Sequence, residues 1–514
     1  MSVPFFAVLL AVYPILSIAA SNPGQVSAGT IGAALLTAAV ASSFLIALMR
    51  APFRSWDRGA LGAAVLIVLF YAYGPIHTAV EPAFLDSLTG TSRLEGLMAR
   101  VAPHLHLAMS ALWTLLAFVG LLALRRARSS HVQGAVRGLN LFALLLTAIV
   151  VAQCCMDKAA RPAQRPSDDA PGGLQLSVAG YNPDVYVIVL DGYAREDVLA
   201  QQYGFDNSEF LDDLRARGFE IGAASAANYH WTFLSLASTL NMNYVQPLMG
   251  DAISPQSESR AAVYDAIRNN AVMRFLRSRG YRSYHLQSTW GATLHNSYAD
   301  VQVPCSGSIF KDEFVRVLAE ASWLKALHSF ESADLAECHL SNFDNLAAVS
   351  SQPGPKFVFA HFLPPHHPYL FGRNGAILKN VTISNQFDFQ RRLWEERGLY
   401  LNQLAFVNSK VSDTVDRILA ASNDRPVIVL MSDHGPNIQR GLSAKDVLRV
   451  RFANFSALLL PGAPPGLVPP SASLVNLYRR IFNHYFEAEL PILPDRYYTS
   501  SYAQPYRLRE VALE

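Results

Sequence analysis

The chain has 514 residues, of which 51% are hydrophobic and 16% charged, and its formal net charge is +2. This length exceeds one ordinary hydrophobic core, so we expect at least two domains. The small net charge, with no basic block interleaved with aromatic residues, argues against nucleic acid as a partner. The apolar residues are concentrated in the first third of the chain, which predicts a membrane-embedded N-terminal part.

Five apolar stretches in this first third approach the roughly 17–25 residues that a helix needs to cross a bilayer. They cover residues 3–20, 30–49, 59–80, 105–124 and 139–155. A signal peptide is the alternative for the first stretch. An anchor is favoured, because Met1-Ser2-Val3-Pro4 carries no basic residue and four more apolar stretches follow. We therefore predict a transmembrane domain of five helices over residues 1–155.

The arginines predict the orientation of these spans, because basic short loops stay in the cytoplasm. Such residues occupy the second and fourth loops, as Arg50, Arg54, Arg58, Arg125, Arg126, Arg128 and Arg137. Five spans that start in the cytoplasm place everything after residue 155 on the far side of the membrane. Cys305 and Cys338 lie in this exported part, where the compartment permits one disulfide between them.

The exported part begins with a polar segment and continues as an α/β domain. Residues 156–182 are rich in Ala, Pro, Gly and polar side chains and predict a flexible linker. From residue 183 to 514, short apolar runs alternate with helix-like segments, which is typical of a mainly parallel central sheet with crossover helices. The runs cover residues 185–190, 281–286, 357–360, 427–431 and 457–460.

Polar side chains follow three of these predicted strands, and ligands of such sheets bind beyond the carboxyl ends of the strands. Asp191 follows the first run, His361 the third, and Asp433-His434-Gly435 the fourth. Asp191 alone is equally well explained as a turn or cap residue, and a turn also remains open for Asp433-His434-Gly435. A carboxylate beside an imidazole suits a divalent cation, and a glycine permits a tight turn.

Thr232 lies where a loop leads into an apolar-faced helix, within residues 228–240. It either caps this helix or directs its hydroxyl at a metal ion. In the second case the cation and the helix dipole together favour the alkoxide and bind an anionic ester. The rival hydroxyls, less well placed, are Ser225, Ser235 and Thr239.

Residues 187–192, Thr232 with its helix and residues 432–435 together resemble the alkaline phosphatase/sulfatase superfamily. The resemblance is strongest to its membrane-anchored branch of lipoteichoic-acid synthases, phosphoglycerol transferases of periplasmic glucans and phosphoethanolamine transferases of lipid A. Those enzymes are similar in having five N-terminal spans, a linker and an exported sulfatase-like domain. The resemblance thus implies a multi-pass protein of the bacterial inner (plasma) membrane, with a catalytic domain over residues 183–514.

The resemblance also implies a metal site, in which Thr232 serves as both ligand and nucleophile. The implied ligands of one divalent metal are Asp191, Thr232, Asp433 and His434. Two carboxylates and an imidazole suit Zn²⁺ or Mn²⁺, with Mg²⁺ as a third candidate. A cation beside the hydroxyl would activate an alcohol that is otherwise a poor nucleophile at neutral pH.

A His-x4-His-x-Pro stretch, similar to one in the phosphoethanolamine transferases, adds catalytic candidates. There such histidines contact the phosphate or the leaving group, which points to His361 and His366, with His367 as the adjacent alternative. A turn stiffened by proline is the other interpretation. The chain departs from the branch at Asp191, where glutamate is usual, and at Pro436, where many relatives carry glutamate. The Cys/Ser-x-Pro-x-Arg motif of ordinary sulfatases is absent around Thr232, which disfavours sulfate ester hydrolysis.

The function that follows is a metal-dependent transfer of a phospho-headgroup, phosphoglycerol or phosphoethanolamine, by way of a phospho-threonine intermediate. The expected partners are a membrane phospholipid as donor and an envelope glycan or lipid as acceptor. One alternative is a hydrolase of phosphodiesters or sulfate esters with the same fold. The other is a non-catalytic membrane-anchored protein that binds envelope glycans or a partner, against which the presence of all four implied ligands argues.

Overall fold

The computed structural model describes residues 4–22, 25–86, 104–159, 182–378, 395–422, 425–437 and 441–513. The chain divides into two compact units, Met1–Arg161 with Phe314–His328 and Pro162–Glu313 with Ser329–Glu514. A short segment from the predicted exported domain thus belongs to the same unit as the N-terminal helices. The predicted linker falls mainly on residues 160–181, which lie outside the described residues.

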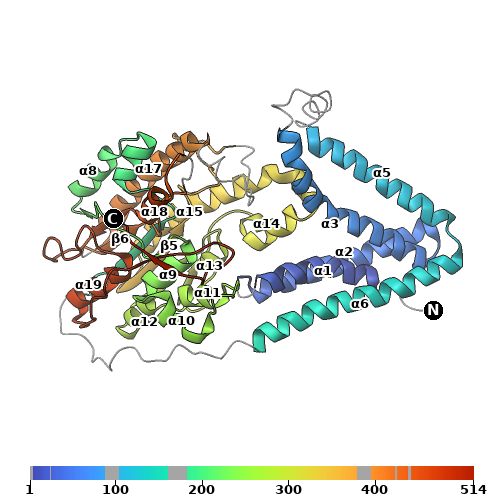
Figure 1. Cartoon of the computed structure of the whole chain (residues 1–514), viewed down its shortest axis with the longest axis horizontal. Coiled ribbons are helices and arrows are strands. Elements are labelled where there is room, and N and C mark those ends of the chain that lie inside the picture. The colour runs from blue at the N-terminus through green and yellow to red at the C-terminus, as the bar shows by residue number, and fades with distance from the viewer. Residues whose placement is uncertain are drawn as a thin grey trace. The chain divides into compact units, whose positions relative to one another are not determined.

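The N-terminal unit is built from long apolar helices (Figure 1). They are α1 Phe6–Ser21, α2 Ala28–Phe53, α3 Trp56–Asp86, α5 Leu105–Arg126 and α6 Ser129–Ala159. Among the described residues, four helices are long and apolar enough to span a membrane, and the apolar α1 is shorter, with 16 residues. Large apolar side chains such as Leu36, Phe44, Leu107 and Phe118 are exposed along these helices, as expected for surfaces that face lipid. The chain is therefore a membrane protein, and five spans remain compatible with the helices observed.

The central sheet of the other unit has seven strands in the order β2-β7-β6-β1-β5-β3-β4. β1 pairs in parallel with β5 and β6, while β7 runs antiparallel to both β6 and β2. The mainly parallel sheet predicted from the apolar runs is therefore confirmed, with an antiparallel part at one edge. The strands are β1 Val185–Leu190, β2 Glu220–Ile221, β3 Arg282–Leu286, β4 Val301–Val303, β5 Lys356–Phe362, β6 Val427–Met431 and β7 Ser456–Leu459.

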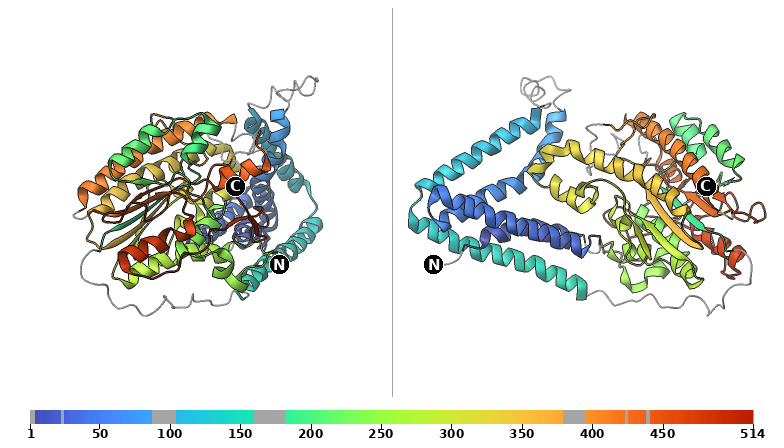
Figure 2. Two further views of the ribbon diagram at one scale, coloured as in Figure 1. Left: turned by 60° about the vertical axis from the view of Figure 1, so that its left-hand side comes forward. Right: turned by 180° about the vertical axis from the view of Figure 1, so that it is seen from behind.

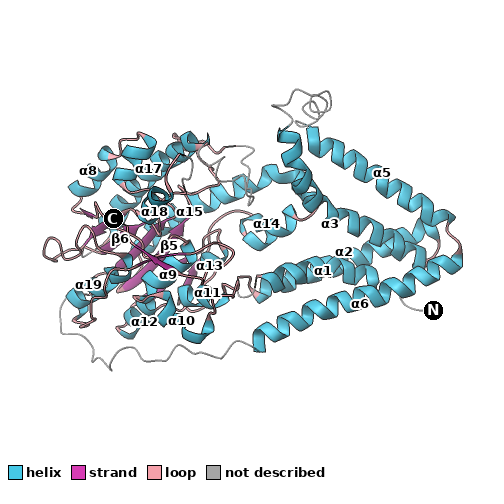
Figure 3. Ribbon diagram, viewed as in Figure 1, coloured by secondary structure: helices cyan, strands magenta, loops and turns pink. Residues whose placement is uncertain are grey.

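Helices cover both faces of this sheet (Figures 2 and 3). Val185, Val187 and Val189 of β1 pack into one core, while Tyr186 and Ile188 pack into the other. Both faces of the strand are buried, so the strand is a continuous apolar run without alternation. The first core is closed by α9 Thr232–Asn241, α10 Val245–Met249, α11 Ala261–Arg268, α12 Ala271–Ser278 and α19 Leu474–Phe486. The second is closed by α8 Ser208–Ala216, α15 Glu331–Ser350 and α17 Arg397–Ala421.

Shorter elements complete the two units. They include α7 Glu196–Val198, η3 Leu199–Tyr203, α13 Gly291–Leu294, α14 Glu313–Glu320, η6 Trp323–Phe330, α18 Ala444–Phe452 and the hairpin of β8 Tyr497–Thr499 with β9 Arg509–Val511. Cys305 and Cys338 form a disulfide, which joins the segment after β4 to α15. These are the two cysteines that the sequence indicated as able to pair. A disulfide of this kind suits an oxidising compartment.

Candidate active site

Three neighbouring strands bring the candidate residues to one edge of the sheet. Because β6, β1 and β5 are parallel, their carboxyl ends meet at that edge. Val189 of β1 is in register with His361 of β5 and with Met431 of β6. The register therefore brings three segments that are far apart in the sequence to one place. They carry Asp191, His361 and the residues after Met431.

Asp191, Asp433 and His434 form a buried cluster at this edge. One ligand atom from each of them lies within 4.8 Å of the others. His434 Nε2 is 3.2 Å from Asp433 Oδ2 and 3.9 Å from Asp191 Oδ1. Asp191 Oδ1 and Asp433 Oδ2 are buried and have no hydrogen-bond partner among the described residues. Two buried carboxylates with unsatisfied oxygens are costly in the absence of a cation, so this donor set fits a divalent metal ion.

Hydrogen bonding sets the tautomer of His434. Its Nδ1 lies 2.9 Å from the carbonyl oxygen of Gly435, which can only accept a hydrogen bond. Nδ1 therefore carries the proton, and the lone pair of Nε2 faces the carboxylates. Burial, and then the nearby guanidinium of Arg451, hold the pKa of His434 well below its ordinary value. This shift favours the neutral ring, which is the form that ligates a metal.

The two carboxyl groups are driven in opposite directions by their surroundings. Burial, reinforced by the negative charge of Asp191, raises the pKa of Asp433. Burial also acts to raise the pKa of Asp191, but the nearby His366 ring and a hydrogen bond with His361 outweigh it and lower that pKa. The Gly192 amide donates to Asp433 Oδ1 at 3.1 Å and fixes its orientation. Such opposed shifts in one buried pair are typical of functional sites.

Thr232 is the first residue of α9, and its hydroxyl reaches the same cluster. Thr232 Oγ1 lies 3.1 Å from His434 Nε2. The N-cap position belongs to Trp231, which makes no capping side-chain hydrogen bond, so Thr232 does not act as the cap. Of the rival hydroxyls, Ser225 donates to Asn454 Oδ1 and Ser235 donates to the carbonyl of Asp433. Ser235 therefore supports the loop that carries Asp433 and does not compete with Thr232.

His361 and His366 both lie beside Asp191. The strand β5 continues to Phe362, so His361 is inside the strand and the predicted end at residue 360 was too early. His361 Nε2 is 3.6 Å from Asp191 Oδ2, while its Nδ1 is 2.9 Å from Thr293 Oγ1. The ring of His366 packs over Gly192, where an added Cβ would lie 3.3 Å from its Cδ2.

The two histidines differ in their access to solvent. His361 is fully buried, whereas His366 is partly exposed. His366 Nδ1 is 2.7 Å from the carbonyl oxygen of His367, so Nδ1 carries a proton. Burial and the neighbouring His366 ring hold the pKa of His367 well below its ordinary value. The structure thus brings His361 and His366 to the cluster from one strand and the loop that follows it.

Arg451 is a component of this region that no sequence pattern indicated. Its guanidinium donates to the Gly435 carbonyl at 3.0 Å and to the His230 carbonyl, and it stacks on Trp231 at 5.4 Å. One buried side chain therefore connects the loop that carries His434 to the loop that leads into Thr232. The sequence offered no signal for it, because only tertiary burial separates Arg451 from the neighbouring Arg449.

Gly435 has a different role from the tight turn predicted for it. It is not among the described residues with positive φ. Instead, an added Cβ would lie 1.9 Å from the Val450 carbonyl oxygen and 2.8 Å from that of Ala453. The glycine is therefore required by close packing of this loop against the C-terminal end of α18.

We expect Gly435→Ala to displace the Asp433-His434 loop, because backbone atoms on both sides leave no room for a methyl group. Overpacking of this kind costs about 3 kcal/mol of unfolding free energy. Thermal unfolding should show the loss, and metal analysis of the purified protein should show reduced metal content. Gly398→Ala in α17 is the matched control, since nothing lies within 4 Å of its added Cβ. Equal metal content and Tm in both variants would contradict the packing argument.

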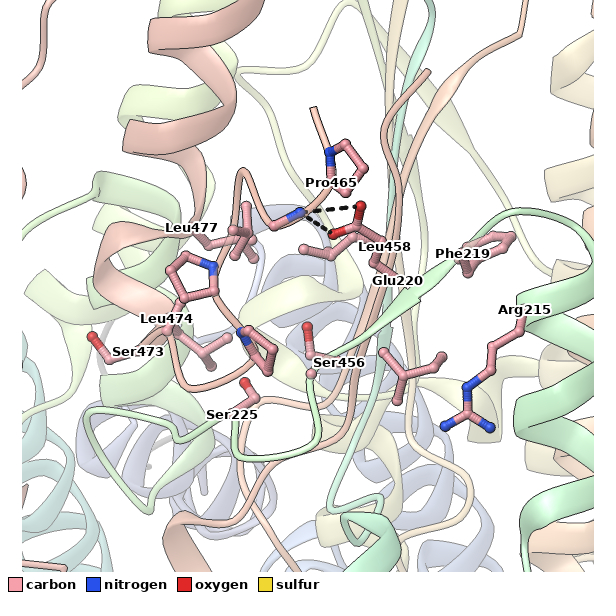
Figure 4. Close-up of a pocket in the computed structure, with 17 residues that line it drawn as sticks. Arg215, Phe219, Glu220, Ser225, Ser456, Leu458, Pro465, Ser473, Leu474 and Leu477 are labelled. Carbon is pink, nitrogen blue, oxygen red and sulfur yellow. Dashed lines mark hydrogen bonds between the residues drawn. The ribbon is translucent and has the colours of Figure 1, made fainter. Parts of the chain in front are cut away.

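A cavity elsewhere in the fold does not include these residues (Figure 4). It has a volume of about 410 Å³ and lies along β2 and β7, at the antiparallel edge of the sheet. Ser225 and Ser456 contribute hydroxyls to its wall, and Glu220 accepts a hydrogen bond from the Gly466 amide. Its lining lacks the carboxylate and imidazole pairing found at the strand ends, so chemistry and not size identifies the candidate active site.

Comparisons with known proteins show what this chain is similar to. A family model described as Sulfatase matches residues 183–455. The C-terminal periplasmic domain of EcEptC from Escherichia coli, in complex with Zn, is 14% identical, with a TM-score of 0.43, 65% of this chain covered and 94% of that one. The C-terminal periplasmic domain of phosphoethanolamine transferase EptC from Campylobacter jejuni is 11% identical (TM-score 0.38; 59% and 90% covered). The lipoteichoic acid synthase LtaP from Listeria monocytogenes is also 11% identical (TM-score 0.39; 63% and 79% covered).

A search of curated proteins found no match. The family model alone spans more than half of the chain and includes Asp191, Thr232, His361, Asp433 and His434. The chain therefore belongs to the sulfatase family of enzymes.

Proposed function

We propose that the protein transfers a phospho-headgroup, phosphoglycerol or phosphoethanolamine, from a membrane phospholipid to an envelope glycan or lipid. The observation that carries this proposal is the Thr232 hydroxyl, 3.1 Å from His434 Nε2 in a buried cluster of carboxylates and imidazole. Apolar helices in the same chain support a donor that resides in the membrane. We further propose the bacterial inner membrane as its location, with the sulfatase-like domain outside the cytoplasm.

Asp191, Thr232, Asp433 and His434 would hold one divalent cation in this proposal. Their carboxylate, hydroxyl and imidazole donors favour Zn²⁺ or Mn²⁺, with Mg²⁺ as the third candidate. When bound, the cation supplies positive charge that favours the threonine alkoxide and offsets the charge of the phosphate. The first turn of α9 adds backbone N–H groups that favour an anion at the same place.

The chain's own residues then account for two displacement steps. In the first, Thr232 Oγ1 gives up its proton and forms a bond to phosphorus, the bond from phosphorus to the diacylglycerol oxygen breaks, and that oxygen takes up a proton. In the second, an acceptor hydroxyl loses its proton and its oxygen bonds to phosphorus, the bond from phosphorus to Thr232 Oγ1 breaks, and that oxygen regains a proton. The partly exposed His366 suits the proton transfers, while the buried His361, held by Thr293, suits binding of the phosphate oxygens.

The test uses the purified full-length protein with phosphatidylglycerol or phosphatidylethanolamine labelled in the headgroup. We expect diacylglycerol to be released and the label to appear on a periplasmic glucan or lipid A added as acceptor. Label found only as free headgroup, with and without acceptor, would replace the transferase with the hydrolase alternative. No diacylglycerol release with any divalent metal would favour the non-catalytic alternative.

A further inference from the structure

A second cluster of polar side chains lies in the N-terminal unit, on two otherwise apolar helices. Tyr73 and His77 lie one turn apart on α3, and His106 lies in the first turn of α5. The rings of His77 and His106 are stacked, with centroids 4.1 Å apart and planes 13° apart. Tyr73 Oη is 2.9 Å from His106 Nδ1. Ionisable groups placed together on membrane helices are costly and usually have a function.

The orientation that the basic loops predict puts this cluster at the outer boundary of the membrane. Arg58, near the start of α3, donates to backbone carbonyls at the C-terminal end of α5, where basic residues predict the cytoplasmic side. His77 lies about 28 Å further along the helix axis, at 1.5 Å per residue. This rise matches the roughly 30 Å thickness of the hydrocarbon core. With Arg58 at the inner boundary, His77 and His106 are expected at the level of the outer lipid headgroups.

A segment from the exported part of the sequence is seated on the same helix ends (Figure 1). Gly74 of α3 permits its approach, because an added Cβ would lie 2.0 Å from the Glu320 carbonyl oxygen. Lys325 Nζ donates to Thr78 Oγ1 at 2.7 Å, and Trp323 Nε1 donates to Ser110 Oγ at 3.3 Å. Tryptophan and lysine are typical anchors at the membrane surface. The segment thus adds a positive charge at Thr78, the residue that follows His77 in α3.

The cluster and the segment that contacts α3 each contribute one partly exposed side chain that can donate hydrogen bonds. His106 and Lys325 are partly exposed, while Tyr73 and His77 are buried behind them. When the Tyr73 hydroxyl donates to His106 Nδ1, the proton of that ring resides on Nε2. An imidazole N–H and an ammonium group together suit a phosphate oxygen. The buried partners hold the imidazole in place.

We propose that His106 and Lys325, positioned by Tyr73 and His77, bind the phosphate of a membrane phospholipid at the extracytoplasmic ends of α3 and α5. This inference rests on the proposed function, in which a phospholipid is the donor. It assigns to the membrane helices a binding role separate from anchoring. Free inorganic phosphate presents the same oxygens, and the experiment distinguishes the two sources.

The test measures lipid binding to full-length protein that carries Thr232→Ala, so that turnover does not deplete the ligand. Native mass spectrometry in detergent compares phosphatidylglycerol, phosphatidylethanolamine and diacylglycerol, which lacks phosphate. We expect retention of the two phospholipids, and about tenfold weaker retention after His106→Gln or Lys325→Gln, since each removes a charge-assisted or neutral hydrogen bond to phosphate. His131→Gln, on the exposed face of α6, is the matched control and should retain both phospholipids.

Three results would overturn the inference. The first is unchanged phospholipid retention when His106→Gln and Lys325→Gln are combined, and the second is retention of diacylglycerol equal to that of the phospholipids. The third is inorganic phosphate that binds as tightly as the phospholipids and loses its binding on the same substitutions. If His106→Gln lowers Tm, Lys325→Gln carries the test, because that side chain is partly exposed at the surface of the unit. Lipid binding is measured in the inactive Thr232→Ala protein, whereas diacylglycerol release is measured in the native protein. A loss of the first with the second intact would refute this binding site and leave the proposed function standing.

Discussion

Thr232→Ala is expected to abolish headgroup transfer while the protein stays folded. The substitution removes the hydroxyl that lies 3.1 Å from His434 Nε2 and leaves both carboxylates in place. Loss of a nucleophile lowers kcat by at least about 10³-fold, because the remaining groups only bind the substrate. Release of diacylglycerol from labelled phospholipid measures the effect, and thermal unfolding checks the fold.

Two further variants make this result specific. Thr232→Ser keeps a hydroxyl and should retain part of the activity, with an intermediate detectable by intact mass spectrometry as a headgroup-phosphate adduct on the serine. Ser225→Ala removes a rival hydroxyl that is engaged with Asn454, and it should not affect transfer. A covalent adduct that persists in Thr232→Ala would assign the nucleophile to another residue.

Asp433→Asn is expected to remove metal binding. Its effect on stability should differ between the metal-free protein and the protein with metal present. In the metal-free protein, burial and the charge of Asp191 raise the pKa of Asp433, so its ionised form is unfavourable there. The neutral amide relieves that penalty and should leave the metal-free Tm unchanged or higher. In the presence of Zn²⁺ or Mn²⁺, the native protein gains stability by binding, and the variant should lose this gain.

The measurement is Tm against metal concentration, together with activity after chelation and metal addition. Chelation should abolish diacylglycerol release by the native protein, and added Zn²⁺ or Mn²⁺ should restore it. Neither chelation nor added metal should change diacylglycerol release by Asp433→Asn. Asp344→Asn is the control, because this carboxylate is exposed and pairs only at the surface with Arg417. A variant that is stabilised by metal as strongly as the native protein would exclude Asp433 as a ligand.

Secondary structure and membrane spans could be predicted because they depend on local pattern. The runs at 185–190 and 427–431 coincide with β1 and β6, since a strand buried on both faces is continuously apolar. The spans followed from the length of apolar segments, which the bilayer thickness sets. Residue types at the strand ends also identified Asp191, Asp433 and His434 as candidates, and the structure brings them within 4.8 Å.

Other features depended on contacts between distant parts of the chain. The parallel pairing of β1 with β5 and β6 decides that Asp191 meets His361 and His434, although about 170 and 240 residues separate them. Burial distinguishes Arg451 from Arg449, and a carbonyl 1.9 Å from an added Cβ explains Gly435. The seating of Lys325 on α3 has no local signal at all. The sequence alone therefore determined the helices and strands and the chemical groups at the strand ends. Tertiary packing decided which side chains meet, because burial and strand register arise only when remote segments come together.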